Sequence, residues 1–468
     1  QLMSCAIASM DSTYRYIRSR KLYRNDSRIV PLAAACVALF VFSFFLRWQY
    51  LAGAEEAIDI RADSVKYFTA AYNNFKFGAH SLDPPNGTRA PSTRTDLAPG
   101  YPIFLSLFFS DPPDSRKIKP KVQLAQAILG SLTCVSALLL AYSFVPLRWA
   151  FFAAFLVAIS PHHIALSEVI LTETLYTSML MTGLATSIYG WRRSSMTMSF
   201  LGMLILCFSG HVRTIGFVVP LALAPILLLT PGGIEPRGMK TRISIGGAAC
   251  VGALVVYVTF QWFAATAMDV AGKNDALQRD YTNLKMPLEY ISNSAKPPKF
   301  YVAGLTHVIV DNRDPDSRFR TERGFSEIPE KYLSWNCCAR WLYAWHFDNA
   351  YNGGVEIYPM RASTFDSSEL LGSLRTLMRW LHWPLYALAI FSGVFAIIVF
   401  LQRKKSGLYA HIFPIAVVWF SFIAGLSIVH WLPRYAIPVY PISYILATTS
   451  LYTITKYIKQ ARGSVTMS

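Results

Sequence analysis

The sequence predicts an all-α polytopic membrane protein of about ten transmembrane helices, with interfacial helices and a small outer-face segment of mixed structure. Of the 468 residues, 53% are apolar and only 15% are charged, whereas about 25% of the residues of soluble proteins are charged. Apolar runs recur from Ile29 to Thr455, several near the roughly 20 residues that cross a bilayer. A soluble protein of this length needs a charged surface that this composition does not supply.

The basic residues cluster in short stretches between the apolar runs. The net charge of +17 therefore indicates membrane topology, and a nucleic-acid partner is not expected. Clusters such as Arg192-Arg193 and Arg403-Lys404-Lys405, placed in the cytoplasm by the positive-inside rule, give a path with both termini inside. The predicted spans are 29–50, 121–145, 148–161, 169–190, 197–210, 213–230, 243–266, 378–402, 407–430 and 434–455.

This topology divides the chain into four regions. They are a basic cytoplasmic N-terminus (1–28), a transmembrane module (29–266) that includes the first outer loop (51–120), an outer-face segment (267–377), and C-terminal transmembrane helices with a cytoplasmic tail (378–468). Functional residues are expected mainly in the two outer-face segments, because they are the longest stretches outside the apolar runs.

The first outer loop contains the string Asp63-Ser64-Val65-Lys66-Tyr67, which predicts an interfacial helix. Its apolar stripe at helical spacing consists of Val65, Phe68, Tyr72 and Phe75. Asp63 and Tyr67 are one turn apart and share a face of that helix. Two interpretations of Asp63 stay open: it caps the helix by accepting backbone N–H bonds, or it performs chemistry at the membrane surface.

Two acidic residues, Glu168 and Glu173, lie near the outer end of the fourth predicted span. Carboxylates at membrane depth are costly and are functional candidates by default. Five residues correspond to about 140° around a helix, so a regular helix does not turn both toward one site, and Glu173 lies deeper in the apolar run. His162 and His163 are candidate ligands of a divalent cation together with Glu168, although such histidines are more often solvated or interfacial.

Arginines stand at the mouths of two predicted helices. Arg434 follows Pro433 at the start of the last span, and Arg213 lies between the fifth and sixth spans. Such an arginine either extends to lipid headgroups or uses its planar fork to bind a phosphate. Nearby aromatic rings either form the ordinary interfacial belt or line a substrate pocket.

Taken together, these motifs resemble the GT-C superfamily of polytopic glycosyltransferases, in the branch of protein mannosyltransferases, lipid A aminoarabinose transferases and mycobacterial-type arabinofuranosyltransferases. The resemblance covers the first half and the last helix. Its motifs are Asp63 to Tyr67, Pro99-Gly100-Tyr101-Pro102, Gln126 to Gly130, Ser160-Pro161 through Thr172-Glu173-Thr174-Leu175, and Pro433-Arg434-Tyr435 with Pro438 and Pro441.

The resemblance implies an inverting transfer of a sugar from a polyprenyl-phosphate donor to a protein, glycan or lipid acceptor. It implies Asp63 as catalytic base and Glu173 as a second catalytic acidic residue. The donor phosphate is expected to bind Arg434, with Arg213 and Lys66 contributing. The pocket is expected to include Tyr67, Tyr101, Glu168, Tyr435 and His430.

The resemblance also implies the setting of the protein. The expected location is a bacterial inner (plasma) membrane, with the site at the periplasmic face and with membrane lipids as neighbours. No cofactor is implied with certainty, and a divalent cation is left open.

The competing hypothesis is a transporter or flippase of a lipid-linked or anionic solute. Such a protein uses the same arginines for binding and needs no base. It keeps its polar groups near the bilayer midplane, whereas the charges here gather in outer loops and at span mouths.

Overall fold

The computed structural model describes a set of long helices and short segments that pack on them. The described residues are 29–54, 63–83, 91, 97–110, 114–193, 195–229, a few between 247 and 258, 345–347, 355–357, 363–402, 408–428 and 433–465. All regular secondary structure within these ranges is helical. This agrees with the all-α prediction, while the expected mixed structure of 267–377 falls mostly outside the described residues.

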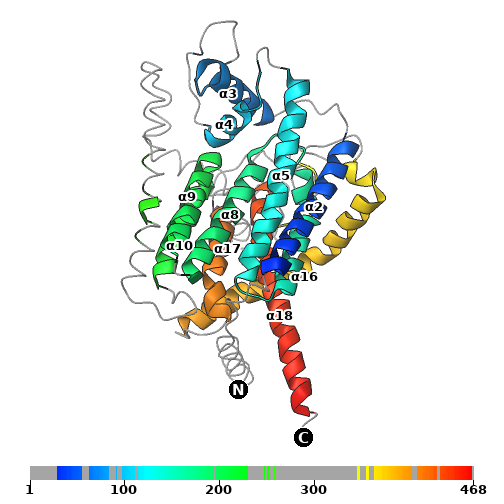
Figure 1. Ribbon diagram of the computed structural model, residues 1–468, viewed down its shortest axis with the longest axis vertical. Helices are drawn as coiled ribbons and strands as arrows, with labels where there is room; N and C mark the ends of the chain where they lie inside the picture. The colour runs from blue at the N-terminus through cyan, green and yellow to red at the C-terminus, as the bar shows by residue number, and fades with distance from the viewer. Residues whose placement is uncertain are drawn as a thin grey trace, which may run out of the picture.

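The long helices pack side by side into a bundle, and two short helices cover one of its ends (Figure 1). The bundle consists of α2 (Ile29–Gly53), α5 (Ser115–Tyr142), α6 (Leu147–Ala158), α8 (Thr172–Arg193), α9 (Met196–Val212), α10 (Val218–Leu229), α16 (Glu369–Leu401), α17 (Leu408–Ile428) and α18 (Tyr440–Val465). The covering helices are α3 (Asp63–Phe77) and α4 (Gly100–Ser106), and this end is called the α3 end below. Shorter elements are α7 (Pro161–Ala165), η2 (Thr214–Phe217), η6 (Thr364–Asp366) and η7 (Pro433–Val439).

Every predicted span other than 243–266 overlaps a helix, with boundaries that differ at several ends, and most of 243–266 lies outside the described residues. Among the described helices, α2, α5 and α16 are long and apolar enough to cross a membrane. Shorter apolar helices include α6, α9 and most of α17. The chain is thus a helical membrane protein by the length and composition of its helices, and the count of about ten spans stays a prediction.

Helix α16 begins at Glu369, nine residues before the predicted span. The Ser368 hydroxyl caps it by accepting the N–H of Leu371 at 3.4 Å. The first part of α16 carries Arg375 and Arg379, and charged residues hide an interfacial helical turn from a search for apolar runs. The predicted boundary at 377–378 therefore falls inside a continuous helix.

The last helix begins later than predicted. Residues 433–439 form the 3₁₀ helix η7, and α18 starts only at Tyr440. Pro438 and Pro441 lack the N–H that an α-helix needs at each interior position. A tighter 3₁₀ segment therefore precedes the helix, and Arg434 lies on η7 and not in the first turn of α18.

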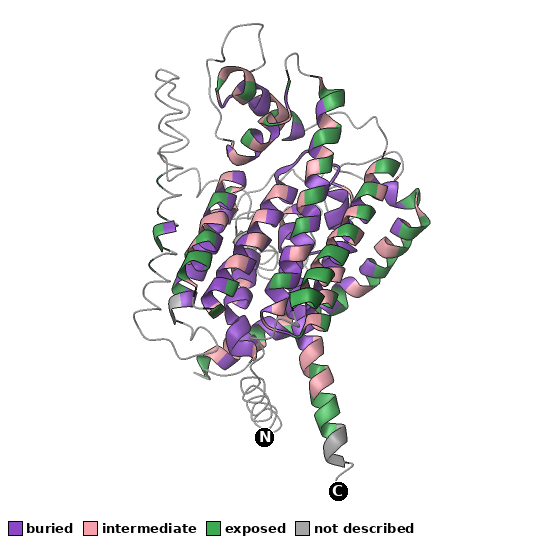
Figure 2. Ribbon diagram, in the orientation of Figure 1, coloured by how far each residue is buried: buried purple, intermediate pink, exposed green. Residues whose placement is uncertain are grey.

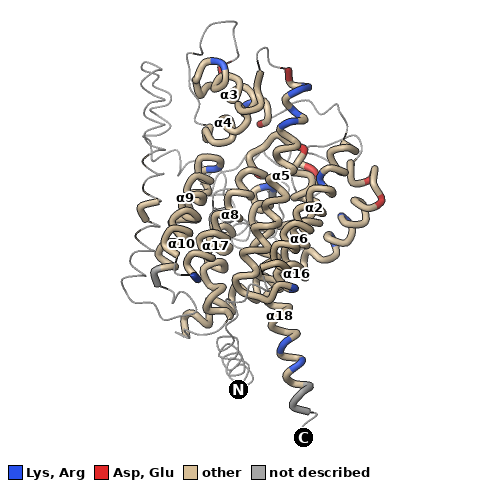
Figure 3. The backbone as a smooth tube through the Cα atoms, in the orientation of Figure 1, with Lys and Arg blue, Asp and Glu red and all other residues tan. Residues whose placement is uncertain are grey.

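The charged residues lie mainly at the ends of the bundle. Figure 3 shows Lys and Arg along the last part of α18 and charges of both signs toward the α3 end, with few between. The helices at the centre of the bundle are largely buried (Figure 2). Burial of an apolar middle between charged ends is the pattern that a bilayer requires.

Helices α8 and α9 approach closely because glycines face each other. A Cβ atom on Gly202 would lie 2.3 Å from the backbone nitrogen of Ser187, and one on Gly183 would lie 2.7 Å from Leu206 Cγ. Small residues of this kind let helix backbones approach within a membrane. The close pair matters for the site, because α8 begins beside Glu173 and α9 ends beside Arg213.

We predict that Gly202→Ala lowers the stability of the purified protein by about 1–3 kcal/mol, because the added methyl overlaps backbone that cannot move separately. Gly247→Ala is the matched control, since nothing lies within 4 Å of a Cβ there. Thermal unfolding in detergent gives the comparison. Equal midpoints for the two variants would contradict the close packing of α8 and α9.

Candidate functional site

Four charged side chains from distant parts of the chain meet at the α3 end. Arg434 Nη2 lies 2.6 Å from Asp63 Oδ2, and its Nε lies 3.9 Å from Glu173 Oε1. Arg213 Nη1 lies 2.9 Å from the same Glu173 oxygen. The result is a continuous chain of charges, Asp63–Arg434–Glu173–Arg213, called the charge cluster below.

Local backbone structure aims each of these side chains at the cluster. Asp63 and Glu173 lie in the first turns of α3 and α8, where the helix dipole favours a negative charge. Arg213 is the C-cap of α9, in an extended conformation with φ −144° and ψ 126°. The backbone therefore stops being helical at Arg213, and the Arg213 side chain extends to Glu173 at the start of α8.

The ring of Tyr435 contacts both arginines. Its centroid lies 4.3 Å from the guanidinium carbon of Arg213 and 5.2 Å from that of Arg434. Arg213 also lies 5.9 Å from the ring centre of Tyr176 on α8. An aromatic face attracts a cation, and Glu173 neutralises part of the positive charge, so two arginines are held close together despite their repulsion.

Within the cluster, side-chain exposure is lowest at Glu173 and highest at Asp63. The side chains of Glu173, Arg434 and Arg213 are 2%, 9% and 12% exposed, whereas Asp63 is 37% exposed. Lys66, 3.6 Å from Asp63 Oδ1, is 59% exposed. The cluster thus opens to the surface at Asp63 and Lys66. Within the cluster two arginines balance two carboxylates, and Lys66 beside Asp63 adds one positive charge at the open side, which favours an anion.

The environment of Asp63 favours its ionised form. Burial alone raises the pKa of this carboxyl, but the hydrogen bond and charge of Arg434, with the charge of Lys66, outweigh burial and hold the pKa below its ordinary value. For Tyr67, burial and then the charge of Glu173 raise the pKa of the phenol. Near neutral pH the site therefore presents a carboxylate beside a protonated tyrosine.

The Pro99 to Pro102 motif connects α3 to the rest of the site. Gly100 leaves room for the C-terminus of α9, since a Cβ there would lie 2.8 Å from the carbonyl oxygen of His211. The Tyr101 ring lies edge-on to Tyr67 at 5.2 Å. The Tyr101 hydroxyl donates to Gln126 Oε1 at 2.8 Å.

Gln126 on α5 holds the loop that leads into α8. Its side-chain amide donates to the carbonyl oxygens of Ser167 and Val169 at 3.1 and 2.9 Å. Through Gln126, the aromatic pair of Tyr67 and Tyr101 is tied to the segment before Glu173. The motif thus has a structural role in addition to the pocket role expected for Tyr67 and Tyr101.

The structure places several predicted site residues elsewhere. Glu168 is buried; its carbonyl oxygen accepts from Gln123 at 3.1 Å, and its charge acts on Tyr50 of α2. His162 bonds the carbonyl oxygen of Phe347 at 2.8 Å, and His163 lies in the electrostatic range of Arg47.

These positions bear on the metal prediction. In the part of the chain that the structure describes, no group of three or more His, Cys, Asp or Glu side chains is arranged to hold a metal ion. The candidates His162, His163 and Glu168 do not form such a group. His430 lies outside the described residues.

Arg47 is a charged residue that the sequence reasoning missed. It is fully buried on α2, where its guanidinium donates to the carbonyl oxygen of Ser43 at 3.0 Å and lies 3.9 Å from Cys134 Sγ. A Cβ on Gly130 would lie 2.4 Å from its Nε. Its position as a single charged residue inside the predicted span 29–50 could have indicated a buried, paired arginine. Arg47 connects α2 to α5 and is not part of the charge cluster.

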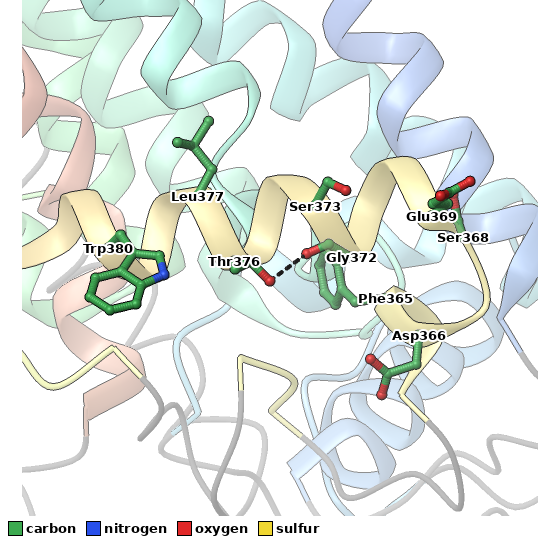
Figure 4. A pocket seen from close by; sticks show the side chains of 9 residues that line it. All are labelled: Phe365, Asp366, Ser368, Glu369, Gly372, Ser373, Thr376, Leu377 and Trp380. Atoms are coloured by element: carbon green, nitrogen blue, oxygen red, sulfur yellow. Dashed lines mark hydrogen bonds between the residues drawn. The ribbon is translucent and has the colours of Figure 1, made fainter.

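A surface hollow of about 590 Å³ lies apart from the charge cluster, along η6 and the first part of α16 (Figure 4). Its polar groups have structural roles: Ser368 caps α16, the Thr376 hydroxyl donates to Gly372, and Asp366 pairs with Arg375. The exposed ring of Trp380 forms part of its apolar wall. None of the predicted catalytic residues lines this hollow.

Comparison with known proteins gives a likeness to solved structures only at low sequence identity. No family model and no curated protein matches the sequence. Structures of the oligosaccharyltransferase AglB of Archaeoglobus fulgidus resemble this chain. The apo form is 16% identical, with a TM-score of 0.48, over 92% of this chain and 51% of that chain. Its complex with an inhibitory peptide and a dolichol-phosphate is 14% identical, with a TM-score of 0.47, over 95% and 52%.

The chain therefore spans about half the length of the AglB structures that it resembles. AglB is an oligosaccharyltransferase that was solved with an inhibitory peptide and a dolichol-phosphate. The donor and the acceptor of the present chain are not given by this likeness.

We predict that Glu173→Gln destabilises the protein by about 3–5 kcal/mol, because it leaves two buried guanidinium groups without their shared anion. Asp366→Asn is the control, since it removes an ion pair whose carboxylate is 59% exposed and is expected to cost at most about 1 kcal/mol. Thermal unfolding of both purified variants tests the difference. A Glu173→Gln protein as stable as the control would show that this carboxylate does not hold the two arginines.

Proposed function

We propose that the chain is an integral-membrane GT-C type glycosyltransferase that transfers a sugar from a polyprenyl-phosphate donor to an acceptor at the outer face of the membrane. The observation that supports this most is the charge cluster. It combines an ionised, partly exposed carboxylate with two buried arginines at one end of an apolar bundle.

The arginines suit the phosphate of a lipid-linked donor. A guanidinium fork binds phosphate oxygens bidentately, and Lys66 beside Asp63 gives the cluster and its open side together one positive charge in excess. A membrane-embedded prenyl tail brings its phosphate to the bilayer surface, the level at which helix ends such as those carrying Arg213 and Arg434 are expected. An arriving phosphate competes with Asp63 for Arg434, and that exchange frees the carboxylate.

The freed carboxylate then acts as the general base. The acceptor hydroxyl or amine attacks the anomeric carbon, Asp63 takes the acceptor proton, and the bond between the anomeric carbon and the phosphate oxygen breaks. The electron pair leaves with the polyprenyl phosphate, whose charge Arg434 and Arg213 stabilise. Attack from the face opposite the phosphate inverts the anomeric centre. General-base catalysis of this kind contributes roughly 10²–10⁴-fold.

A transporter fits the structure less well. Its polar binding groups belong near the middle of the spans, whereas the charge cluster lies at the helix ends beneath α3. Arg47 is a charged residue buried within the bundle, but it bonds Ser43 of its own helix and Cys134 of α5. These bonds connect two helices and do not form a solute-binding site. Transfer of sugar to an acceptor without movement of a solute across the membrane would support the glycosyltransferase and exclude the transporter.

We predict that Asp63→Asn lowers transfer by about 10²–10⁴-fold while folding and donor binding persist, since the amide keeps the shape and cannot accept the proton. The assay is transfer of labelled sugar from a polyprenyl-phosphate donor by the purified protein. Asp114→Asn is the control, because Asp114 only caps α5 by accepting the N–H of Arg116, and asparagine caps a helix about as well. Near-normal transfer by the Asp63→Asn variant would exclude Asp63 as the general base.

We predict graded losses at Arg434. Arg434→Lys keeps the charge and loses the planar fork, so donor affinity should fall by roughly tenfold, and Arg434→Ala should be much worse. Binding of a non-hydrolysable polyprenyl-phosphate sugar measures this directly. The control is Arg375→Lys, which changes the ion pair with Asp366 at the hollow along α16. This variant is expected to bind the donor analogue normally. If lysine at 434 binds as well as arginine, the residue serves only as a headgroup anchor.

A further inference from the structure

A short piece of the predicted outer-face segment inserts deeply into the helical bundle. Trp345 and Phe347 are 1% and 3% exposed, and residues 345–347 are called the finger below. The Trp345 ring lies 4.6 Å from that of Tyr386 on α16, 5.9 Å from that of Trp419 on α17 and 5.2 Å from that of Tyr440 on α18. The finger therefore touches three helices at once.

Two buried histidines fix the finger by its backbone. His382 Nε2 donates to the carbonyl oxygen of Trp345 at 2.5 Å, and His162 Nε2 donates to that of Phe347 at 2.8 Å. The Phe347 ring also lies edge-on to the His162 ring at 4.8 Å. Backbone acceptors and large rings thus hold this position jointly.

The finger bridges the two segments that lead into the charge cluster. His162 belongs to α7, whose following loop runs to Glu173, and Thr174 ties that loop to α8 by donating to the carbonyl oxygen of Leu166 at 2.9 Å. Tyr440 is the first residue of α18, directly after the η7 segment that carries Arg434. The His162 and Tyr440 rings are 5.3 Å apart.

We propose that the finger is a positioning element for the charge cluster: by wedging between α7 and the η7–α18 junction, it sets the placement of Arg434 relative to Glu173 and Asp63. The proposal rests on the proposed function for its catalytic consequence. Misplacement of a catalytic group by about 1 Å can cost roughly 10²-fold.

The geometric test does not depend on activity. Cysteines replace Asp63 and Arg434 in a background whose seven native cysteines are substituted and whose thermal stability is retained. A short bis-methanethiosulfonate reagent then crosslinks positions 63 and 434. Adding Phe347→Ala is expected to slow this crosslinking about tenfold. Phe347→Leu, which nearly conserves volume but removes the ring from His162, is the second variant in case the alanine protein unfolds.

Trp191→Phe is the matched control for a buried aromatic, because Trp191 lies at the other end of α8 and bonds the carbonyl oxygen of Leu227 at 3.3 Å. It should leave crosslinking unchanged. Wild-type crosslinking rates in folded Phe347 variants would overturn the proposal. Slow crosslinking in the Phe347 variants, together with no sugar transfer by the protein that keeps Asp63 and Arg434, would support the positioning role and reject the proposed function.

The catalytic consequence is tested by a double-mutant cycle. Phe347→Ala alone is expected to lower kcat by about 10- to 100-fold with a smaller change in acceptor KM. Combined with Arg434→Lys, it should cost much less than the product of the two single effects, since both act on one group. Fully multiplicative effects would show that the finger acts independently of Arg434.

Discussion

The shared contact of Glu173 with two arginines is the interaction on which the rest of the site depends. A buried carboxylate is unfavourable in an apolar bundle unless it is paired, and so is each of the two guanidinium groups. One Glu173 oxygen lies 2.9 Å from Arg213 and 3.9 Å from Arg434. This contact fixes the start of α8, the end of α9 and η7 relative to one another.

Asp63 is the most exposed member of that arrangement. Its partner Arg434 also contacts Glu173 and the ring of Tyr435. Asp63 itself is partly exposed on a helix that covers the bundle. A carboxylate in such a place can exchange its cation for a proton donor without unfolding the core. In the proposed mechanism, an anion that displaces Asp63 from Arg434 would leave the carboxylate at the surface, free to accept a proton.

Some of the site could be predicted from the sequence because its residues stand in recognisable local patterns. Asp63 and Tyr67 share a helical face, Glu173 lies deep in an apolar run, and Arg213 and Arg434 stand at helix mouths. The structure brings these residues together. Their roles in catalysis stay predictions.

Other features depend on contacts that no local pattern contains. The Asp63–Arg434 bond joins residues 371 positions apart, and the insertion of Trp345 and Phe347 depends on four separate helices. The histidines at 162 and 382 serve backbone carbonyls, which the sequence does not distinguish from metal ligation. The late start of α18 was obscured because prolines can precede or interrupt an apolar run.

The central claim is that the charge cluster receives the phosphate of a lipid-linked sugar. The most direct measurement is an experimental structure of the protein in a lipid nanodisc with a non-hydrolysable polyprenyl-phosphate sugar. We predict phosphate density within hydrogen-bond reach of the Arg434 and Arg213 guanidinium groups, with the anomeric carbon facing a carboxylate of Asp63 that has left Arg434. Phosphate bound in the hollow along α16, or near the middle of the helices beside Arg47, would contradict the account.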